Sequence, residues 1–196
     1  MKQIAIIDYN AGNIRSVLFA LERLGVEPIL TRDADVLNAA DKIIFPGVGE
    51  AGTTMNYLKE TGLADLIRNY RKPFLGICLG LQLMCKHSEE GDTECLGIFD
   101  LSVVKFPGDM GLKVPHMGWN TVDGNGHELF KGLETDPYFY FVHSYYAELS
   151  DVTIGQSNYG LPFTSVLAND NYMATQFHPE KSGLQGEILL KNFINI

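Results

Sequence analysis

The sequence contains few cysteines, little basic charge and no long apolar run. Its three cysteines form no Cys-x-x-Cys pair, which argues against a disulfide scaffold and against a zinc site. The net charge of −9 argues against nucleic-acid binding, because few basic side chains are left to neutralise phosphates. The first apolar stretch ends at Asp8, too early for a signal peptide, and no stretch has membrane length. We therefore expect a protein of the reducing cytoplasm with no metal, cofactor, nucleic acid or membrane partner.

The length and the order of the predicted elements favour one α/β domain over residues 1–196. Apolar strand patterns in the first half alternate with helical patterns, and they occupy residues 2–8, 27–31, 42–45 and 74–77. This alternation predicts an open, mostly parallel sheet with helices on both faces.

The second half has a different pattern, with little helical periodicity before its last residues. Strand patterns separated by Gly, Pro, Asn and Asp occupy residues 101–106, 138–142, 161–167 and 172–177. They predict antiparallel or mixed strands that extend or flank the first sheet. A final helix is expected over residues 183–196.

The most informative stretch is Gly76-Ile-Cys78-Leu-Gly80. A strand pattern precedes the cysteine and a helical pattern follows it, so Cys78 is predicted at a sharp strand-to-helix turn. Glycines two positions to either side leave room around such a turn, as in a nucleophile elbow with sulfur in place of oxygen. A helix N-terminus also favours the thiolate. We interpret Cys78 as a nucleophile, with a buried packing cysteine as the alternative.

A cysteine nucleophile needs a base that a third group orients. Of the five histidines, His178 has the most suitable surroundings, because it follows a predicted strand and begins the sequence His178-Pro179-Glu180. Proline favours an extended residue before it, and residues two apart in an extended chain point to the same side. We therefore predict that Glu180 orients His178, with a surface tripeptide of no role as the alternative.

Acyl chemistry also needs N–H donors for a developing oxyanion. The N–H of Leu79 directly follows the nucleophile. Pro46-Gly-Val-Gly49 offers a second donor through its glycines, although for this tetrapeptide alone a simple turn is the better explanation. Asn10, Gly47 and Cys78 each follow a predicted strand, so we expect them at one rim of the sheet. Together these parts predict a Cys-His-Glu acyl transferase or hydrolase that acts on an amide.

The chain resembles the class I (triad) glutamine amidotransferases over essentially its whole length. The resemblance rests on the cysteine stretch through Gln82 and on His178-Pro179-Glu180. Within that family the chain is similar to the glutaminase subunits of imidazole glycerol phosphate synthases, and Val114-Pro-His-Met-Gly-Trp-Asn120 is the most discriminating part of the resemblance. Further matching stretches are Asp8-Tyr-Asn-Ala-Gly-Asn13, Pro46-Gly-Val-Gly49, Phe141-Val-His-Ser-Tyr145 and His178-Pro-Glu-Lys-Ser182.

The resemblance implies a flavodoxin-like glutaminase fold and hydrolysis of L-glutamine to glutamate and ammonia. It implies that Cys78 forms a glutamyl thioester, that His178 carries the proton and that Glu180 orients His178. The implied oxyanion residues are Val48, Gly49 and Leu79, and the peptide between Val48 and Gly49 has to reorient before its N–H is useful. The implied glutamine-binding residues are Gly47, Gly49, Gln82, His143, Ser144 and Tyr145.

The resemblance also implies a (β/α)8-barrel cyclase subunit that receives the ammonia in histidine biosynthesis. The positions that match its interface are Asn10, Asn13, Trp119, Tyr140 and Lys181. For Trp119 a buried structural role is the alternative. The chain departs from the family pattern at Glu50 and Ala51, where Ala and an aromatic residue are expected, and this puts the packing behind the oxyanion segment in doubt.

Three other functions stay open from the sequence. They are another class I glutaminase with a different acceptor, a free-standing cysteine amidase or peptidase, and a non-catalytic flavodoxin-like module. The first predicts the same catalytic residues and a different partner. The second needs no partner, and the third requires an inert thiol.

Overall fold

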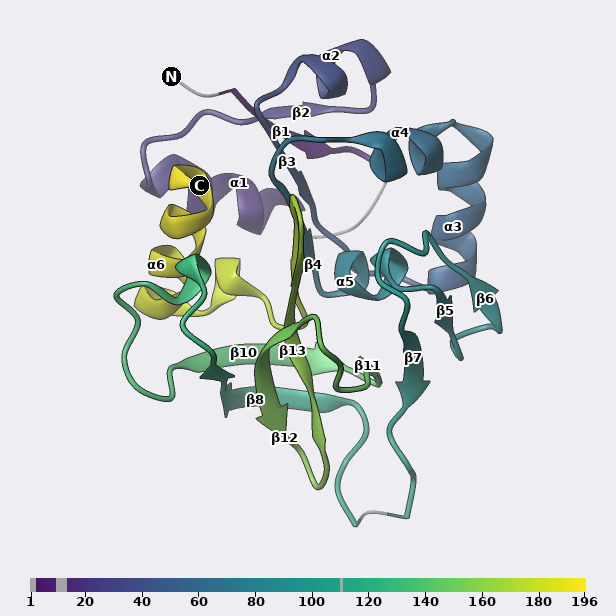
Figure 1. The fold of residues 1–196 in the computed structure, drawn as a ribbon, viewed down its shortest axis with the longest axis vertical. Helices are drawn as coiled ribbons and strands as arrows, with labels where there is room; N and C mark the ends of the chain where they lie inside the picture. Colours follow the sequence, from purple (N-terminus) through teal and green to yellow (C-terminus); the bar gives the residue numbers. More distant parts are fainter. Residues whose placement is uncertain (1–2, 10–13, 110) are drawn as a thin grey trace.

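The computed structural model describes residues 3–9, 14–109 and 111–196, and these residues form a 12-stranded mixed sheet with flanking helices (Figure 1). The central strands are parallel, in the order β2 (Ile29–Thr31), β1 (Ile4–Ile7), β3 (Lys42–Phe45), β4 (Phe74–Ile77) and β14 (Tyr172–Thr175). β14 is the last strand of the chain, yet it pairs with β4, with Thr175 opposite Ile77. This pairing brings the C-terminal half of the chain to the end of β4, directly before Cys78.

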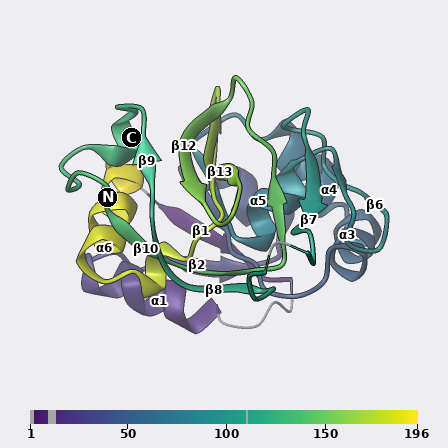
Figure 2. The ribbon, with the colours of Figure 1, turned by 90° about the horizontal axis from the view of Figure 1, so that it is seen from below.

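Helices cover both faces of the parallel strands, as Figures 1 and 2 show. One face carries α1 (Ile14–Arg23) and α6 (Gly183–Asn195). The other carries α2 (Ala34–Ala39), α3 (Ala51–Glu60), α4 (Leu63–Asn69) and α5 (Leu79–Met84). Because side chains alternate along a strand, β1 contributes Ile4 and Ile6 to the first core and Ala5 and Ile7 to the second. The predicted parallel sheet with helices on both faces is confirmed.

The remaining strands of the large sheet come from the middle and second half of the chain and pair mostly antiparallel. They are β5 (His87–Ser88), β6 (Thr93–Glu94), β7 (Ser102–Lys105), β9 (Asp123–Gly124), β11 (Tyr145–Ala147), β12 (Thr153–Asn158) and β13 (Pro162–Asn169). β13 pairs with β14 and continues the sheet toward β11 and β7. The sequence analysis did not predict β5, β6, β9, β11 or β12. For β5, β6 and β9 the reason is that a strand of 2 residues shows no alternation.

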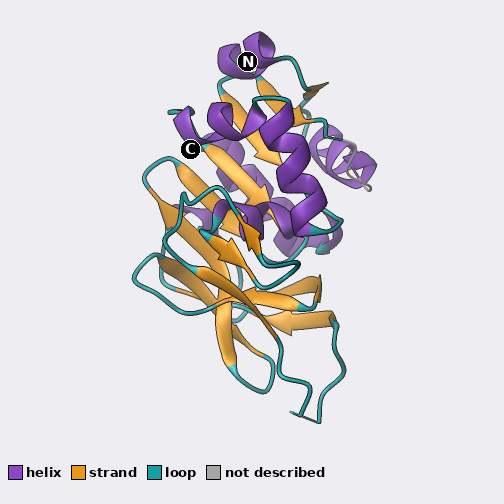
Figure 3. Cartoon of the chain, turned by 90° about the vertical axis from the view of Figure 1, so that its right-hand side faces the viewer, coloured by secondary structure: helices purple, strands orange, loops and turns teal. Residues whose placement is uncertain are grey.

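A separate two-stranded sheet consists of β8 (His116–Thr121) and β10 (Tyr138–His143). Their antiparallel register places Trp119 opposite Tyr140. Phe139 and Phe141 of β10 are fully buried, so one face of this sheet closes the core, and the other face is open to solvent. Figure 3 shows helices gathered around the parallel strands and, below them, the antiparallel strands and loops.

Two 3-10 turns complete the fold, η1 (Glu128–Phe130) and η2 (Pro179–Lys181). η2 packs closely against α6 at Gly186, where an added Cβ would lie only 1.9 Å from the carbonyl oxygen of Pro179. Only glycine allows this approach, which places the turn that contains Glu180. Among the described residues, none of the helices has the length and apolar character that a membrane span requires.

Replacing Gly186 with alanine should destabilise the fold by about 1–3 kcal/mol, because the new methyl group overlaps the Pro179 carbonyl and the helix has to move. Denaturant unfolding measures the loss. Gly108→Ala is the control, since Gly108 is exposed and an added Cβ there meets nothing within 4 Å. Equal losses in the two variants would show that the Gly186 contact has no special effect.

Candidate active site

Cys78 occupies a strained turn between β4 and α5. Its φ of 54° and ψ of −104° lie in a region that residues with a Cβ rarely adopt. A Cβ at Gly76 would lie 2.6 Å from Met84 Sδ and 3.0 Å from the backbone carbonyl carbon of Gly80, and one at Gly80 would lie 2.3 Å from the Phe45 carbonyl oxygen. Both glycines are therefore needed for steric reasons, as the elbow pattern predicted.

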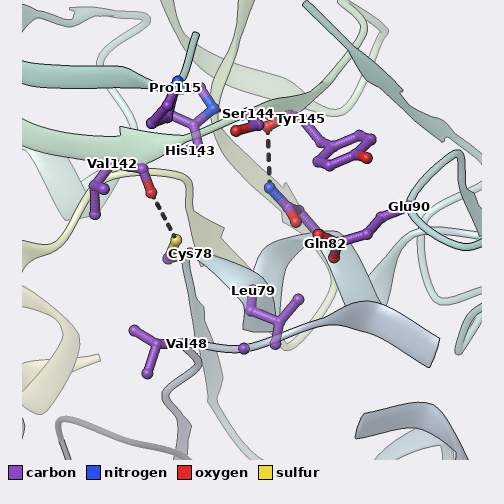
Figure 4. A pocket seen from close by; sticks show the side chains of 11 residues that line it. Val48, Cys78, Leu79, Gln82, Glu90, Pro115, Val142, His143, Ser144 and Tyr145 are labelled. Carbon is purple, nitrogen blue, oxygen red and sulfur yellow. Dashed lines mark hydrogen bonds between the residues drawn. The ribbon is translucent and has the colours of Figure 1, made fainter. Parts of the chain in front are cut away.

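The thiol of Cys78 lines a cavity of about 300 Å³ (Figure 4). The lining residues are Val48, Gly49, Cys78, Leu79, Gln82, Glu90, Pro115, Val142, His143, Ser144 and Tyr145. The Sγ atom donates to the Val142 carbonyl at 3.7 Å, and Gln82 Nε2 donates to the Tyr145 carbonyl at 3.0 Å. The cavity therefore brings Cys78, the predicted nucleophile, together with every residue implied for glutamine binding except Gly47. An added Cβ at Gly47 would lie 2.7 Å from Leu79 Cβ and from Tyr9 Oη.

His178 and Glu180 form a buried pair. The Nδ1 atom of His178 donates to Glu180 Oε1 at 2.8 Å, and both side chains are only 2% exposed. Burial lowers the pKa of the imidazole, but the electrostatic interaction with Cys78 and the hydrogen bond to Glu180 outweigh it and raise the pKa of His178 to about 10. The other ring nitrogen, Nε2, has no hydrogen-bond partner within the described residues. His178 is thus oriented by a carboxylate and keeps one nitrogen open for proton transfer.

The chain segment 46–49 lies against the start of α5. The N–H of Leu79 donates to the Gly47 carbonyl at 3.4 Å, and Tyr9 Oη donates to the Pro46 carbonyl at 2.5 Å. Burial raises the pKa of Tyr9 well above its usual range, which keeps the phenol a donor. Gly49 has a φ of +138°, which favours glycine. The Leu79 N–H, predicted as an oxyanion donor, is therefore turned toward Gly47 in this structure.

Two glutamates fix the chain just after this segment. Glu50 caps α3 by accepting from Gly52 N at 2.9 Å and Thr53 N at 2.7 Å, and the hydrogen bonds from Thr53 and Gly52 lower the pKa of its carboxyl. Glu90 accepts from Ala51 N at 2.8 Å, and its burial raises the pKa of its carboxyl. The departure from the family pattern at Glu50 thus supplies a helix cap.

Glu90 also lines the cavity beside Gln82 (Figure 4), and the sequence analysis did not identify it as a site residue. It stands in a run of charged and polar residues that is typical of a solvated turn. The only sequence feature that indicated a site role for Glu90 was its position shortly after the helix that follows Cys78. Its place in the cavity follows from the pairing of β5 with β7, which a sequence pattern does not reveal.

A pair of buried histidines, His116 and His143, lies beside the cavity, and His143 lines it. His116 Nδ1 lies 2.9 Å from His143 Nε2, and His143 Nδ1 donates to the Tyr145 carbonyl at 2.8 Å. Because a carbonyl only accepts, His143 carries its proton on Nδ1 and His116 donates from its own Nδ1. Burial lowers the pKa of His116 to about 4 and that of His143 to about 3. Both rings are therefore neutral at neutral pH and hold the segment before Tyr145 in place.

The structure brings together three of the residues that the resemblance placed at a partner interface. The ring centres of Trp119 and Tyr140 lie 6.0 Å apart, and Lys181 Nζ lies 6.0 Å from the centre of the Tyr140 ring. Trp119 is 55% exposed, so the alternative of a buried tryptophan is wrong. Asn10 and Asn13 lie outside the described residues. We call the exposed side of β8 and β10 the aromatic face; it also carries Met117 and Tyr138.

Known sequences similar to this chain agree in family. The family model described as glutamine amidotransferase class-I matches residues 5–196. The chain is 56% identical over 195 residues to the imidazole glycerol phosphate synthase subunit HisH of Bacteroides thetaiotaomicron, with 99% of this chain and 100% of that protein covered. It is 48% identical over 195 residues to the protein of the same name from Escherichia coli K12, with 98% and 99% covered.

Solved structures with a similar fold are more distant in sequence. A putative GMP synthase protein from Thermoplasma acidophilum has a TM-score of 0.75 at 22% identity, with 100% of this chain and 94% of that chain covered. The PurLQS structure from Thermotoga maritima has a TM-score of 0.73 at 18% identity, with 100% and 99% covered. These likenesses show that the fold is shared.

Acid should destabilise the protein through His116 and His143. Burial lowers the pKa of His116 to about 4. Between about pH 4 and about pH 6.5 the unfolded chain therefore binds more protons than the folded chain. Stability therefore decreases as the pH falls through this window, by up to about 1.4 kcal/mol per pH unit for each histidine. Urea unfolding at several pH values measures the slope.

The matched variant for this prediction is His116→Phe. The His116 ring stacks on Phe141 and Tyr159, with ring centres 5.0 Å and 4.0 Å away, so phenylalanine suits the same space. This variant should show a smaller acid slope than the wild type. An unchanged slope would mean that other groups cause the acid sensitivity.

Proposed function

The chain belongs to the class-I glutamine amidotransferase family, and we propose on that basis that it is the glutaminase subunit of imidazole glycerol phosphate synthase, which hydrolyses L-glutamine to glutamate and ammonia. The observation that carries the proposal is Cys78 on a strained turn at a small cavity, together with the buried His178–Glu180 pair, in which Cys78 raises the pKa of the His178 imidazole. The identity to HisH proteins over nearly the whole chain supports the choice of synthase. We take residues 1–196 as one glutaminase domain.

In the proposed reaction, the Cys78 thiol first gives its proton to His178 Nε2, which the raised pKa of His178 favours, and the resulting thiolate attacks the carboxamide carbon. The carbon–nitrogen bond then breaks, His178 returns the proton to the leaving nitrogen, and ammonia departs from a glutamyl thioester. A water molecule that loses its proton to His178 cleaves the thioester and releases glutamate. Glu180 holds the Nδ1–H throughout and stabilises the charged imidazole in both steps.

The glutamine head group carries an ammonium and a carboxylate, and both need partners in the cavity. The carboxylate of Glu90 supplies a negative acceptor for the ammonium. Gln82 and the backbone of His143, Ser144 and Tyr145 are proposed to hold the rest of the head group. Gln82 already bonds to the Tyr145 carbonyl, which supports its place on this wall.

The oxyanion of the proposed intermediates would accept from Leu79 N–H and from the peptide between Val48 and Gly49. Since Leu79 N–H donates to the Gly47 carbonyl in this structure, the segment 46–49 has to shift before both donors are available. Gly49 gives the segment the conformational freedom for this shift. We propose that the shift accompanies partner binding, so that glutamine is hydrolysed when an acceptor for ammonia is present.

The proposed partner is a (β/α)8-barrel cyclase subunit that forms a heterodimer with this chain and receives ammonia through a channel. The aromatic face is the proposed docking surface, because Met117, Trp119 and Tyr138 expose large apolar area there. The charge of Lys181 lies beside it, over the half-buried Tyr140 ring. We assign Asn10 and Asn13 to the same interface. Since a cysteine nucleophile has to stay reduced, we place the complex in the cytoplasm.

Cys78→Ala should abolish glutamine hydrolysis while the fold and partner binding persist, because alanine fits the turn and lacks the nucleophile. Ammonia release from glutamine, measured in the complex with the cyclase subunit, tests this. Free ammonium should restore product formation by the complete synthase. Retained hydrolysis would rule out Cys78 as the nucleophile, and failed rescue by ammonium would rule out the proposed division of labour.

Trp119→Ala should weaken binding of the cyclase subunit by about tenfold or more, because large exposed aromatics dominate the energy of interfaces. Leu149→Ala is the matched control, since Leu149 is also an exposed apolar residue, 43% exposed, and lies outside the aromatic face. Titration calorimetry measures both. High glutaminase activity of the isolated wild-type chain, equal to that of the complex, would instead favour a free-standing amidase.

A further inference from the structure

Gln176 is fully buried, and the proposed reaction does not use its side chain. It directly follows β14, where its backbone N–H donates to the Ser165 carbonyl at 2.8 Å. Its Nε2 atom lies 3.7 Å from Cys78 Sγ, and its Oε1 atom lies 3.2 Å from Gln82 Nε2. A buried amide therefore stands between the nucleophile and a residue of the head-group wall.

The hydrogen bonds fix which end of the Gln176 amide faces the sulfur. The Tyr145 carbonyl only accepts, so Gln82 has to present its Nε2 there, at 3.0 Å. That same nitrogen also approaches Gln176, which therefore presents its oxygen to Gln82. The NH2 group of Gln176 is left to point at Cys78. The amide NH2 groups of Gln82 and Gln176 therefore link the Tyr145 carbonyl to Cys78 Sγ in one chain of hydrogen bonds.

We propose that Gln176 is a positioning residue for the nucleophile: its amide N–H holds the sulfur of Cys78, and Gln82 holds that amide. The proposal rests on the function proposed above and adds a link between the head-group wall and the reacting atom. Gln176 Nε2 lies 3.7 Å from Cys78 Sγ, and Cys78 interacts electrostatically with His178, so both side chains lie toward Cys78.

The second contact of the sulfur explains why such a donor is useful. The thiol of Cys78 donates to the Val142 carbonyl at 3.7 Å, and it has to leave this acceptor when it gives its proton to His178. The carbonyl of Val142 repels the sulfur once the proton is gone, because both atoms are then acceptors without a proton between them. The N–H of Gln176 attracts the sulfur before and after the transfer, and more strongly after it.

Gln176→Met tests this role, because methionine has a similar length and no N–H donor. In the complex with the cyclase subunit, kcat for glutamine hydrolysis should fall about tenfold while KM stays within about twofold, since the lost contact acts on the reacting sulfur. Alkylation of Cys78 by iodoacetamide in the isolated chain, followed by mass spectrometry of the Cys78 peptide, should also slow at neutral pH.

Two further variants complete the experiment. Thr175→Val removes a buried hydrogen bond of the adjacent residue, 3.1 Å to the Phe177 carbonyl, and should leave kcat and alkylation close to wild type. Gln82→Leu removes the partner that orients Gln176. Gln82→Leu should therefore slow alkylation of Cys78, although iodoacetamide has no glutamine head group that Gln82 could bind. This variant also provides the test if Gln176→Met does not fold.

The outcomes separate the two proposals. Three results would each overturn the role of Gln176. The first is an unchanged alkylation rate in both Gln176→Met and Gln82→Leu, and the second is a loss of kcat or alkylation rate in Thr175→Val equal to that in Gln176→Met. The third is a higher KM with an unchanged kcat in Gln176→Met. A wild-type complex that does not hydrolyse glutamine would overturn the proposed function. The alkylation rates of the isolated chain would still decide whether Gln176 holds the sulfur.

Discussion

The turn at Cys78 is the constraint around which the site is arranged. A residue with a Cβ at positive φ is strained, and it persists only where its surroundings leave no alternative. Here the surroundings are Gly76 on one side, against Met84, and Gly80 on the other, against the Phe45 carbonyl. The backbone bond from Cys78 to Thr175 ties the turn to β14. These contacts hold the strained turn and place the thiol at the mouth of a cavity.

The His178–Glu180 pair and the His116–His143 pair have imidazole pKa values that shift in opposite directions, although burial lowers the pKa of all three imidazoles, and the difference is the charge nearby. His178 faces Glu180 and Cys78, so its pKa rises although burial acts against it. His116 and His143 face each other and a carbonyl, so burial lowers the pKa of each and they stay neutral. One pair is therefore suited to move protons, and the other is suited to hold a wall of the cavity.

The division of the sheet corresponds to a division of roles. The parallel strands carry Cys78 and the segment 46–49, which directly follow β4 and β3. The antiparallel part supplies the cavity wall at Tyr145 and the exposed aromatic face, and the segment after β14 supplies His178. β14 joins these parts, because it is parallel to β4 and antiparallel to β13.

Features that depend on local geometry could be predicted from the amino-acid sequence. Apolar runs at β1 and β3 predicted the parallel layer, and the glycine spacing around Cys78 predicted the elbow. The spacing of His178 and Glu180 predicted a pair that the structure shows at 2.8 Å. Contacts between distant segments, such as Glu90 in the cavity and Gln176 at the sulfur, became visible only in the folded chain. The reason is physical: periodicity encodes which face a side chain takes, whereas strand pairing decides what that face meets.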